Sequence, residues 1–218
     1  MIAAWPSPSG GEEYAVVFDG NRDRRLLILP ALFDESNKLR HFTVEVMRLL
    51  DAAGMDCFLP DLPGCNESVA PLPEQTLDSW RNAAQAAASH FRATYVLAIR
   101  GGALAAPPGL PGWRYGAVKG EALLRAMLRA RVLASREAGM EESREELLER
   151  GKAEGLQLAG YRLGPEMIRQ LQGALPADLV DVAQNELGAP GLWLRAEPDH
   201  NPEQASALAD LLARNQSE

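Results

Sequence analysis

Arg100 is the residue of this chain whose position bears most directly on chemistry. It follows the apolar run YVLAI at 95–99 and precedes Gly101 and Gly102. A buried strand, a tight turn of small residues and a helix start are the setting of the G-x-S-x-G motif, which presents a nucleophilic serine at the turn. Ala98 and Gly102 stand at the two glycine positions, and Arg100 stands at the serine. Because a guanidinium stays protonated at neutral pH, it cannot act as a serine-type nucleophile.

Two roles for Arg100 follow from its place at this turn. In the first, its guanidinium and the N–H groups of the helix start bind a carboxylate or phosphate. In the second, Arg100 pairs internally with Asp34, Glu35 or Asp61, and this role is favoured because an unpaired buried arginine is costly. The first role predicts a cleft for a small anionic or saccharide-like ligand, formed by Leu32, Asp34, Asn37, Cys65, Arg100 and Gly101.

Asp34, Glu35 and His200 are the remaining candidates for a catalytic role. A genuine ester hydrolase could use Asp34 or Glu35 with His200 to activate water, and Arg100 to stabilise an oxyanion. However, a general acid needs a raised pKa, which a neighbouring arginine opposes. His200 lies in a late loop without a serine to activate, so we interpret it as a solvated loop histidine. Cys65 would need a nearby base to become a nucleophile, and the sequence supplies none clearly.

Residue spacing does not favour a metal or a nucleotide cofactor. The sequence has no cluster of His, Cys and carboxylate residues with the spacing of metal ligands. Gly101 and Gly102 lack the third glycine and the ribose-binding acid of a dinucleotide fingerprint. His41 and His90 fall within expected helices, which indicates structural or surface roles. We therefore expect no metal and no cofactor.

Composition limits the protein to a few broad classes. A chain of 218 residues fits one α/β domain (1–218). The net charge of −8 argues against a general nucleic-acid binder, which needs a basic face. No apolar run has the length of a membrane span, and the first residues do not resemble a secretory signal. The two cysteines, Cys57 and Cys65, indicate a reducing cytoplasm rather than a disulfide framework.

Alternating elements in the first half predict a mostly parallel sheet with helices on both faces. The loops that follow the expected strands would lie at the C-terminal edge of the sheet, where ligands bind in such folds. Residues before Glu12 are expected to form a loose lead. The expected strands are 14–18, 25–29, 55–59 and 95–99; the expected helices are 39–53 and 76–91; the loops are 31–38, 61–68 and 100–102.

The second half is mainly helical. Residues 120–155 include an arginine-bearing helix at 120–138 and a charge-dense helix at 141–152, and they predict a helical cap over the cleft or a partner surface. A short extended piece at 161–163 and a helix at 165–175 with proline near its first position follow. The apolar run LWLR at 192–195 is expected to be the last strand, before a terminal helix that ends near Arg214.

Several segments resemble one known family. Residues 61–68 (DLPGCNES) resemble the D-x-x-G-x-G-x-S turn of α/β-hydrolases, and 34–40 (DESNKLR) resemble the E-E-x-N-K-x-R stretch of exosortase A system-associated hydrolases of the second type. That family is also similar in having arginine at the elbow. The resemblance covers 24–174, including VKGEALLR at 118–125 and AGYRL at 159–163, and extends to Trp193 and Glu197. Ala98 and Cys65 depart from its glycines, and one late strand is missing.

The resemblance implies a three-layer α/β-hydrolase-like fold and an association with bacterial exopolysaccharide production. The leading hypothesis is a protein of this fold that lacks serine hydrolase activity because Arg100 replaces the nucleophile. The alternatives are a hydrolase with the unconventional residues named above and a non-catalytic partner protein in polysaccharide assembly, for which a homodimer is one possible form.

Overall fold

The computed structural model describes residues 1–214, and its centre is a mixed sheet in the order β1-β2-β4-β3-β5-β6-β9. The strands from β4 to β9 in this order are mutually parallel, whereas β1 and β2 are antiparallel to their neighbours. This arrangement confirms the predicted mostly parallel sheet. The strands are β1 (Ile2–Pro6), β2 (Glu12–Phe18), β3 (Arg25–Leu29), β4 (Asp56–Pro60), β5 (Tyr95–Ile99), β6 (Gly112–Tyr115) and β9 (Val180–Val182).

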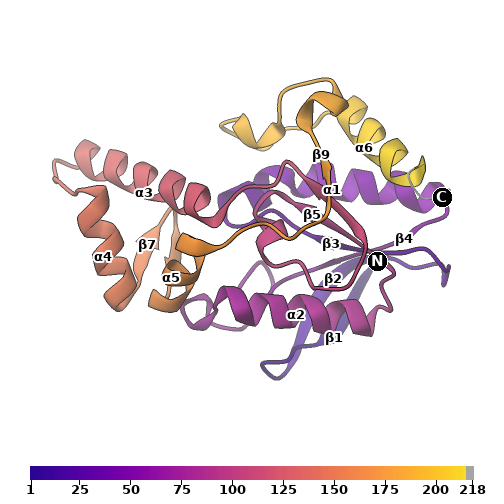
Figure 1. Cartoon of the computed structure of the whole chain (residues 1–218), viewed down its shortest axis with the longest axis horizontal. Helices are drawn as coiled ribbons and strands as arrows, with labels where there is room; N and C mark the ends of the chain where they lie inside the picture. The colour runs from indigo at the N-terminus through magenta and orange to yellow at the C-terminus, as the bar shows by residue number, and fades with distance from the viewer. Residues whose placement is uncertain (215–218) are drawn as a thin grey trace.

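Helices cover both faces of the sheet, as predicted. Figure 1 shows α1 (Asp34–Ala52) and α6 (Pro202–Arg214) on one face and α2 (Leu77–His90) on the other. Successive side chains of a strand point to opposite faces, so Leu26 and Ile28 of β3 pack in the core beneath α1 and α6, while Leu27 and Leu29 pack beneath α2. Burial of β3 on both faces explains its unbroken apolar sequence.

The chain between β6 and β9 forms a mainly helical lobe, which extends from one end of the sheet (Figure 1). It contains α3 (Gly120–Glu137), α4 (Arg144–Glu154), the hairpin β7 (Leu156–Leu158) and β8 (Tyr161–Leu163), and α5 (Pro165–Gly173). The predicted cap segment 120–155 is therefore the first part of a larger insertion. Glu142 joins α3 to α4, because its carboxylate pairs with Arg131 at 2.7 Å and with Arg150 at 2.9 Å. These ion pairs hold the pKa of Glu142 at about 2.

Four sequence predictions are corrected by the structure. The expected loose lead contains strand β1, and β6 and β9 were not predicted. Residues Leu192–Leu194, expected to be the last strand, form a short 3-10 helix in which Leu194 is exposed. Helix α1 begins at Asp34 rather than at residue 39, so part of the expected 31–38 loop is helical. Within residues 1–214, no helix has the length and apolar character needed to cross a membrane.

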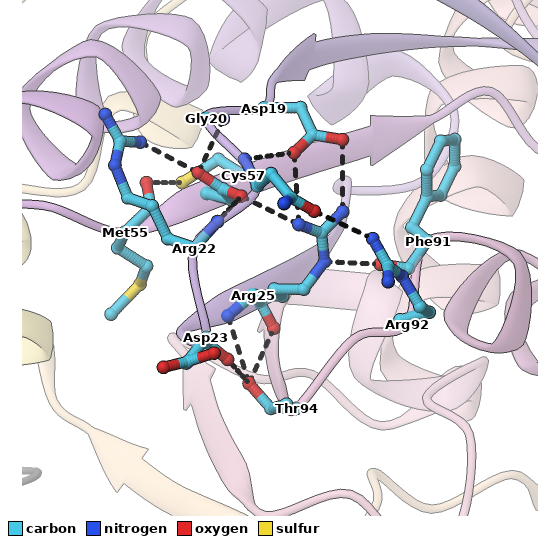
Figure 2. Close-up of polar contacts among 12 residues, drawn as sticks. Asp19, Gly20, Arg22, Asp23, Arg25, Met55, Cys57, Phe91, Arg92 and Thr94 are labelled. Carbon is cyan, nitrogen blue, oxygen red and sulfur yellow. Dashed lines mark hydrogen bonds and ion pairs between the residues drawn. The ribbon is translucent and has the colours of Figure 1, made fainter.

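A network of ion pairs lies at the N-terminal ends of β3 and β4. Figure 2 shows the guanidinium of Arg25 beside Asp19, with the backbone carbonyl of Phe91 as a further acceptor. The buried carboxylate of Asp56 lies 2.8 Å from Arg25 and 2.8 Å from Arg22. It also accepts hydrogen bonds from the backbone N–H groups of Gly20 and Arg22. The predicted elbow lies at the opposite, C-terminal edge, where β5 ends at Ile99.

Candidate functional site

The predicted elbow is present at the end of β5, where Arg100 has a φ of +53°. A left-handed backbone costs a non-glycine residue roughly 1–2 kcal/mol, so the surrounding structure must hold Arg100 in place. Gly102 fits because a Cβ there would lie only 2.4 Å from the carbonyl oxygen of Pro30. The helix start expected after the turn is a short 3-10 helix, Arg100–Leu104. The helix whose N-terminus would help to bind an anion therefore has only five residues.

The guanidinium of Arg100 is occupied by an internal partner. Its Nε donates to Glu35 Oε2 at 3.0 Å, and its Nη2 donates to Glu35 Oε1 at 2.8 Å. Its Nη1 donates to the backbone carbonyl of Gly116 at 2.6 Å. The two side chains are 15% and 18% exposed. This geometry confirms internal pairing, with Glu35 as the partner among the three that the sequence suggested, and it removes the free fork needed for a ligand anion.

Trp193 covers the other side of this ion pair. The guanidinium carbon of Arg100 lies 4.1 Å from the centre of a Trp193 ring, within the range of a cation–π interaction. Gly116 and Gly191 make room for the indole, since a Cβ at either position would lie within 2.8 Å of it. Tyr115 packs against Trp193 edge to face, and its hydroxyl donates to Gln184 at 2.5 Å. Burial raises the pKa of Tyr115 above its ordinary value, which keeps the hydroxyl neutral.

The other predicted catalytic groups are not gathered at Arg100. Asp34 is 61% exposed and pairs with Lys38 at 2.7 Å. The imidazole of His200 stacks on that of His41, with ring centres 4.3 Å apart. Of the proposed hydrolytic set, Glu35 and Arg100 form an ion pair with each other, and that contact neutralises both. His90 lies at the end of α2 beside Phe91.

Two hollows lie beside the elbow and share Leu32 and Phe33. The first, which we call the small cavity, has a volume of about 70 Å³ and contains the predicted ligand residues Asn37 and Cys65. Burial raises the pKa of Cys65 to about 12, so its thiol is protonated at neutral pH and is a poor nucleophile. The small cavity is lined by Pro30, Ala31, Leu32, Phe33, Ser36, Asn37, Leu62, Gly64, Cys65, Asn66 and Tyr161.

The second hollow, which we call the cap cleft, has a volume of about 230 Å³ and separates the start of α1 from α3. Its polar residues all come from the first turns of α1, and its apolar residues come mainly from the inserted lobe. The side chain of Leu32 also approaches Gly101, where a Cβ would lie 3.1 Å from Leu32 Cγ. The cap cleft is lined by Leu32, Phe33, Asp34, Glu35, Lys38, Leu123, Ala126, Met127, Ala130, Ala159 and Trp193.

Strained backbone is concentrated around these hollows. Phe33, Asn66 and Ala159 have φ values of +56°, +48° and +47°; Phe33 lines both hollows, Asn66 the small cavity and Ala159 the cap cleft. Arg100 contacts Glu35 and Trp193 in the cap-cleft wall. Such conformations cost about 1–3 kcal/mol each and cluster at functional sites in proteins. The sequence carried no signal for Phe33, because an apolar residue before a helix is ordinarily not strained.

Two buried carboxyl groups lie near the small cavity. Asp61 accepts a hydrogen bond from Asn66 at 2.6 Å and lies 3.4 Å from Arg40, so its partner is not Arg100. Glu13, which the sequence did not single out, accepts from Ser68 at 3.0 Å, and its Oε2 is buried without a hydrogen-bond partner among the described residues. Burial is the main cause that raises the pKa of both carboxyl groups.

The described residues contain no group of three or more His, Cys, Asp or Glu side chains placed to hold a metal ion. The elbow and its surroundings present a mostly apolar cleft whose charged residues, Asp34, Glu35 and Lys38, are each paired with an opposite charge.

Several solved structures that resemble this chain are named as hydrolases or esterases, and the likeness shows that it has the α/β-hydrolase fold. The esterase domain of a Rhodothermus marinus protein aligns with a TM-score of 0.56 and 12% identity, over 98% of this chain and 95% of that one. Est1E from Butyrivibrio proteoclasticus, with ferulic acid bound, gives 0.53 and 16%, over 78% and 70%. Mouse alpha/beta hydrolase domain-containing protein 10 gives 0.53 and 14%, over 79% and 69%. No family model and no curated protein matches the sequence.

Proposed function

We propose that this protein binds a small molecule without hydrolysing it, and that it retains the α/β-hydrolase fold as a scaffold for the cap cleft. The observation that carries the proposal is the two-pronged contact between Arg100 and Glu35. An elbow that presents a paired guanidinium offers neither a nucleophile nor a free positive charge for an oxyanion. The cleft beside it is left for recognition rather than for bond cleavage.

The hydrolytic alternative would require Asp34 or Glu35, His200 and Arg100 to act on one substrate. Asp34 binds Lys38 and His200 stacks on His41, both outside this set, while Glu35 and Arg100 bind each other. A general base must come within hydrogen-bond reach of the water that it activates, next to the bond to be cleaved. The separate pairings therefore favour the non-hydrolytic function.

Ester hydrolysis by the purified protein is the direct test. A panel of p-nitrophenyl esters with acyl chains of increasing length would be incubated with wild type, Arg100→Ala and a serine esterase of the same fold as the positive control. We expect turnover by the wild type to equal that of Arg100→Ala and of buffer. Turnover that disappears in Arg100→Ala would refute the proposal and make Glu35 and His200 catalytic candidates again.

A role in bacterial exopolysaccharide production is a second proposal, supported by the resemblance to exosortase A system-associated hydrolases. The segments that carry the resemblance converge in space: Glu35 from 34–40 binds Arg100, and Tyr161 from 159–163 packs on Phe33 with ring centres 5.5 Å apart. Deleting the gene in its host and measuring polysaccharide yield tests this role. Loss of yield that is restored by wild type and by an inactive-elbow variant, Arg100→Met, would support a non-catalytic partner.

A further inference from the structure

The cap cleft has room for a single ring. Its volume is about 230 Å³. This is below the usual range for drug-sized sites, which begins at about 300 Å³. A six-membered ring with one short substituent fits such a space.

The walls of the cleft favour an aromatic ring over a sugar. Phe33 and Trp193 supply aromatic surface, and Met127 supplies a polarisable thioether that contacts ring edges favourably. Ala126 and Ala130 on α3 are exposed to the cleft, and their small side chains create its depth. The polar groups of the lining are confined to the first turns of α1, so most of the wall offers the hydroxyls of a sugar no partner.

The charges at the rim cancel. Asp34 pairs with Lys38 at 2.7 Å, and Glu35 pairs with Arg100 at 2.8 Å. The two carboxylates also lie in the first turn of α1, where they already complement the positive end of the helix dipole. An anionic ligand would meet two carboxylates, and a cationic ligand would meet an ammonium and a guanidinium, each already paired.

We propose that the cap cleft is a binding site for an uncharged aromatic ring with a short polar substituent, such as a hydroxyl-bearing benzene derivative. This inference rests on the proposed non-hydrolytic function and names the ligand class of the same site. The ring lies against Trp193 and Met127, and its substituent faces the Asp34–Lys38 pair. The paired rim excludes the small anion that the sequence suggested.

Three probes of similar size and different charge test the ligand class: benzyl alcohol, benzoate and benzylamine. Binding to the ¹⁵N-labelled protein would be measured by chemical-shift titration at pH 7. We expect benzyl alcohol to bind at least about tenfold more tightly than benzoate or benzylamine, because a charge without a partner is costly to desolvate. Tighter binding of either charged probe would overturn the proposal, and so would tighter binding of methyl glucoside used as an uncharged sugar ring.

A matched pair of variants tests the location. Ala130→Leu places three further carbon atoms in the cleft, whereas Ala134→Leu makes the same change one turn later, at an exposed position of α3 outside the cleft lining. Leucine and alanine have similar helix propensities, so both variants should fold. We expect Ala130→Leu to weaken benzyl alcohol binding at least about tenfold and Ala134→Leu to leave it unchanged. Equal affinities, or no binding of benzyl alcohol by wild type, would overturn the site. Both of these results concern the ligand of the cap cleft. Ester turnover is a separate measurement, and it tests the proposed non-hydrolytic function.

Discussion

At the tip of the elbow, Arg100 donates two hydrogen bonds to Glu35 and one to Gly116, and lies over Trp193. Removing one partner of a mostly buried ion pair leaves the other charge without compensation. For Arg100→Met, which keeps the apolar contact with Trp193, we expect a loss of about 2–3 kcal/mol in the free energy of unfolding, somewhat less than for a fully buried pair. Urea denaturation followed by circular dichroism measures it.

The control for this prediction is Asp34→Asn, one residue before Glu35. It breaks the exposed pair with Lys38, and pairs of this kind contribute about 0.3–0.5 kcal/mol. If Arg100→Met and Asp34→Asn shift the unfolding midpoint equally, the Arg100–Glu35 contact does not hold the elbow. A double variant, Arg100→Met with Glu35→Gln, should lose less than the sum of the two single losses, because each single change already breaks the same contact.

Glu13 makes stability depend on pH in a defined direction. Its pKa is raised in the folded protein mainly by burial, so the folded state holds the proton more tightly than the unfolded chain. The resulting stabilisation is fully present below the ordinary pKa of 4.5 and is lost as pH rises through the raised value. Glu13→Gln keeps an oxygen to accept from Ser68 and carries no charge. We expect it to have a higher urea midpoint than wild type at pH 7.5, and no such advantage at pH 4.

An unchanged difference between Glu13→Gln and wild type across this pH range would contradict the burial argument. Asp23→Asn provides a comparison at a carboxyl group closer to solvent, and its difference from wild type should be small at both pH values.

Sequence reasoning located Arg100 but could not choose its partner. Asp34 and Glu35 are adjacent, and both were candidates for the same ion pair. Because α1 already begins at Asp34, their side chains point about 100° apart around the helix, so only one can face the elbow. The sequence placed both in a loop, where this distinction does not exist. Glu13 was missed for a related reason, since its burial depends on a loop that returns 55 residues later to place Ser68 beside it.

At the scale of elements, the elbow depends on a close approach between two backbones. A Cβ on Gly102 would lie 2.4 Å from the carbonyl oxygen of Pro30 and 2.6 Å from that of Leu29. Backbone atoms cannot move aside as a flexible side chain can, so β3 and the elbow must separate. For Gly102→Ala we expect a loss of about 2–3 kcal/mol in the free energy of unfolding. Thermal melting monitored by circular dichroism measures the change.

Gly173→Ala is the matched control, because a Cβ there meets nothing within 4 Å at the end of α5. Alanine should leave stability unchanged or raise it by up to about 1 kcal/mol, since glycine is the poorer helix former. If Gly102→Ala and Gly173→Ala have the same melting temperature, the elbow tolerates a side chain at Gly102. The close approach of the two backbones would then be less restrictive than the distances indicate.

Elements with strong periodicity were predicted, and short edge elements were not. The buried strands β3, β4 and β5 and the amphipathic helices α2, α3 and α6 carry long apolar patterns in the sequence. Strand β9 has only three residues, of which two are exposed, so alternation cannot reveal it. LWLR was mistaken for a strand because Leu192 and Trp193 are apolar for another reason: Leu192 packs in the core beside α6, and Trp193 covers Arg100.

At the scale of the whole molecule, the two edges of the parallel sheet carry different kinds of polar structure. At the edge where β3 and β4 begin, Asp56 is fully buried and satisfied by four donors, and neither hollow extends to that edge. At the opposite edge, the paired elbow and both hollows lie together. If the cap cleft binds its ligand as proposed, changes at the ionic edge should alter stability without altering ligand affinity.

Asp56→Asn tests this separation, with Asp51→Asn as its control, because both carboxylates bind Arg22 but only Asp56 is buried. In Asp56→Asn, the amide nitrogen that replaces one carboxylate oxygen would face one backbone N–H and one guanidinium N–H, so we expect a loss of about 3–5 kcal/mol in the free energy of unfolding. Asp51 is 38% exposed, and its loss should be at most about 1 kcal/mol. Urea unfolding would be followed by circular dichroism, and benzyl alcohol affinity would be measured where each variant is fully folded. If the ionic network does not affect the cap cleft, both variants bind benzyl alcohol with the wild-type affinity while their unfolding midpoints differ. A loss of affinity in Asp56→Asn would show that the ionic network also shapes the cap cleft.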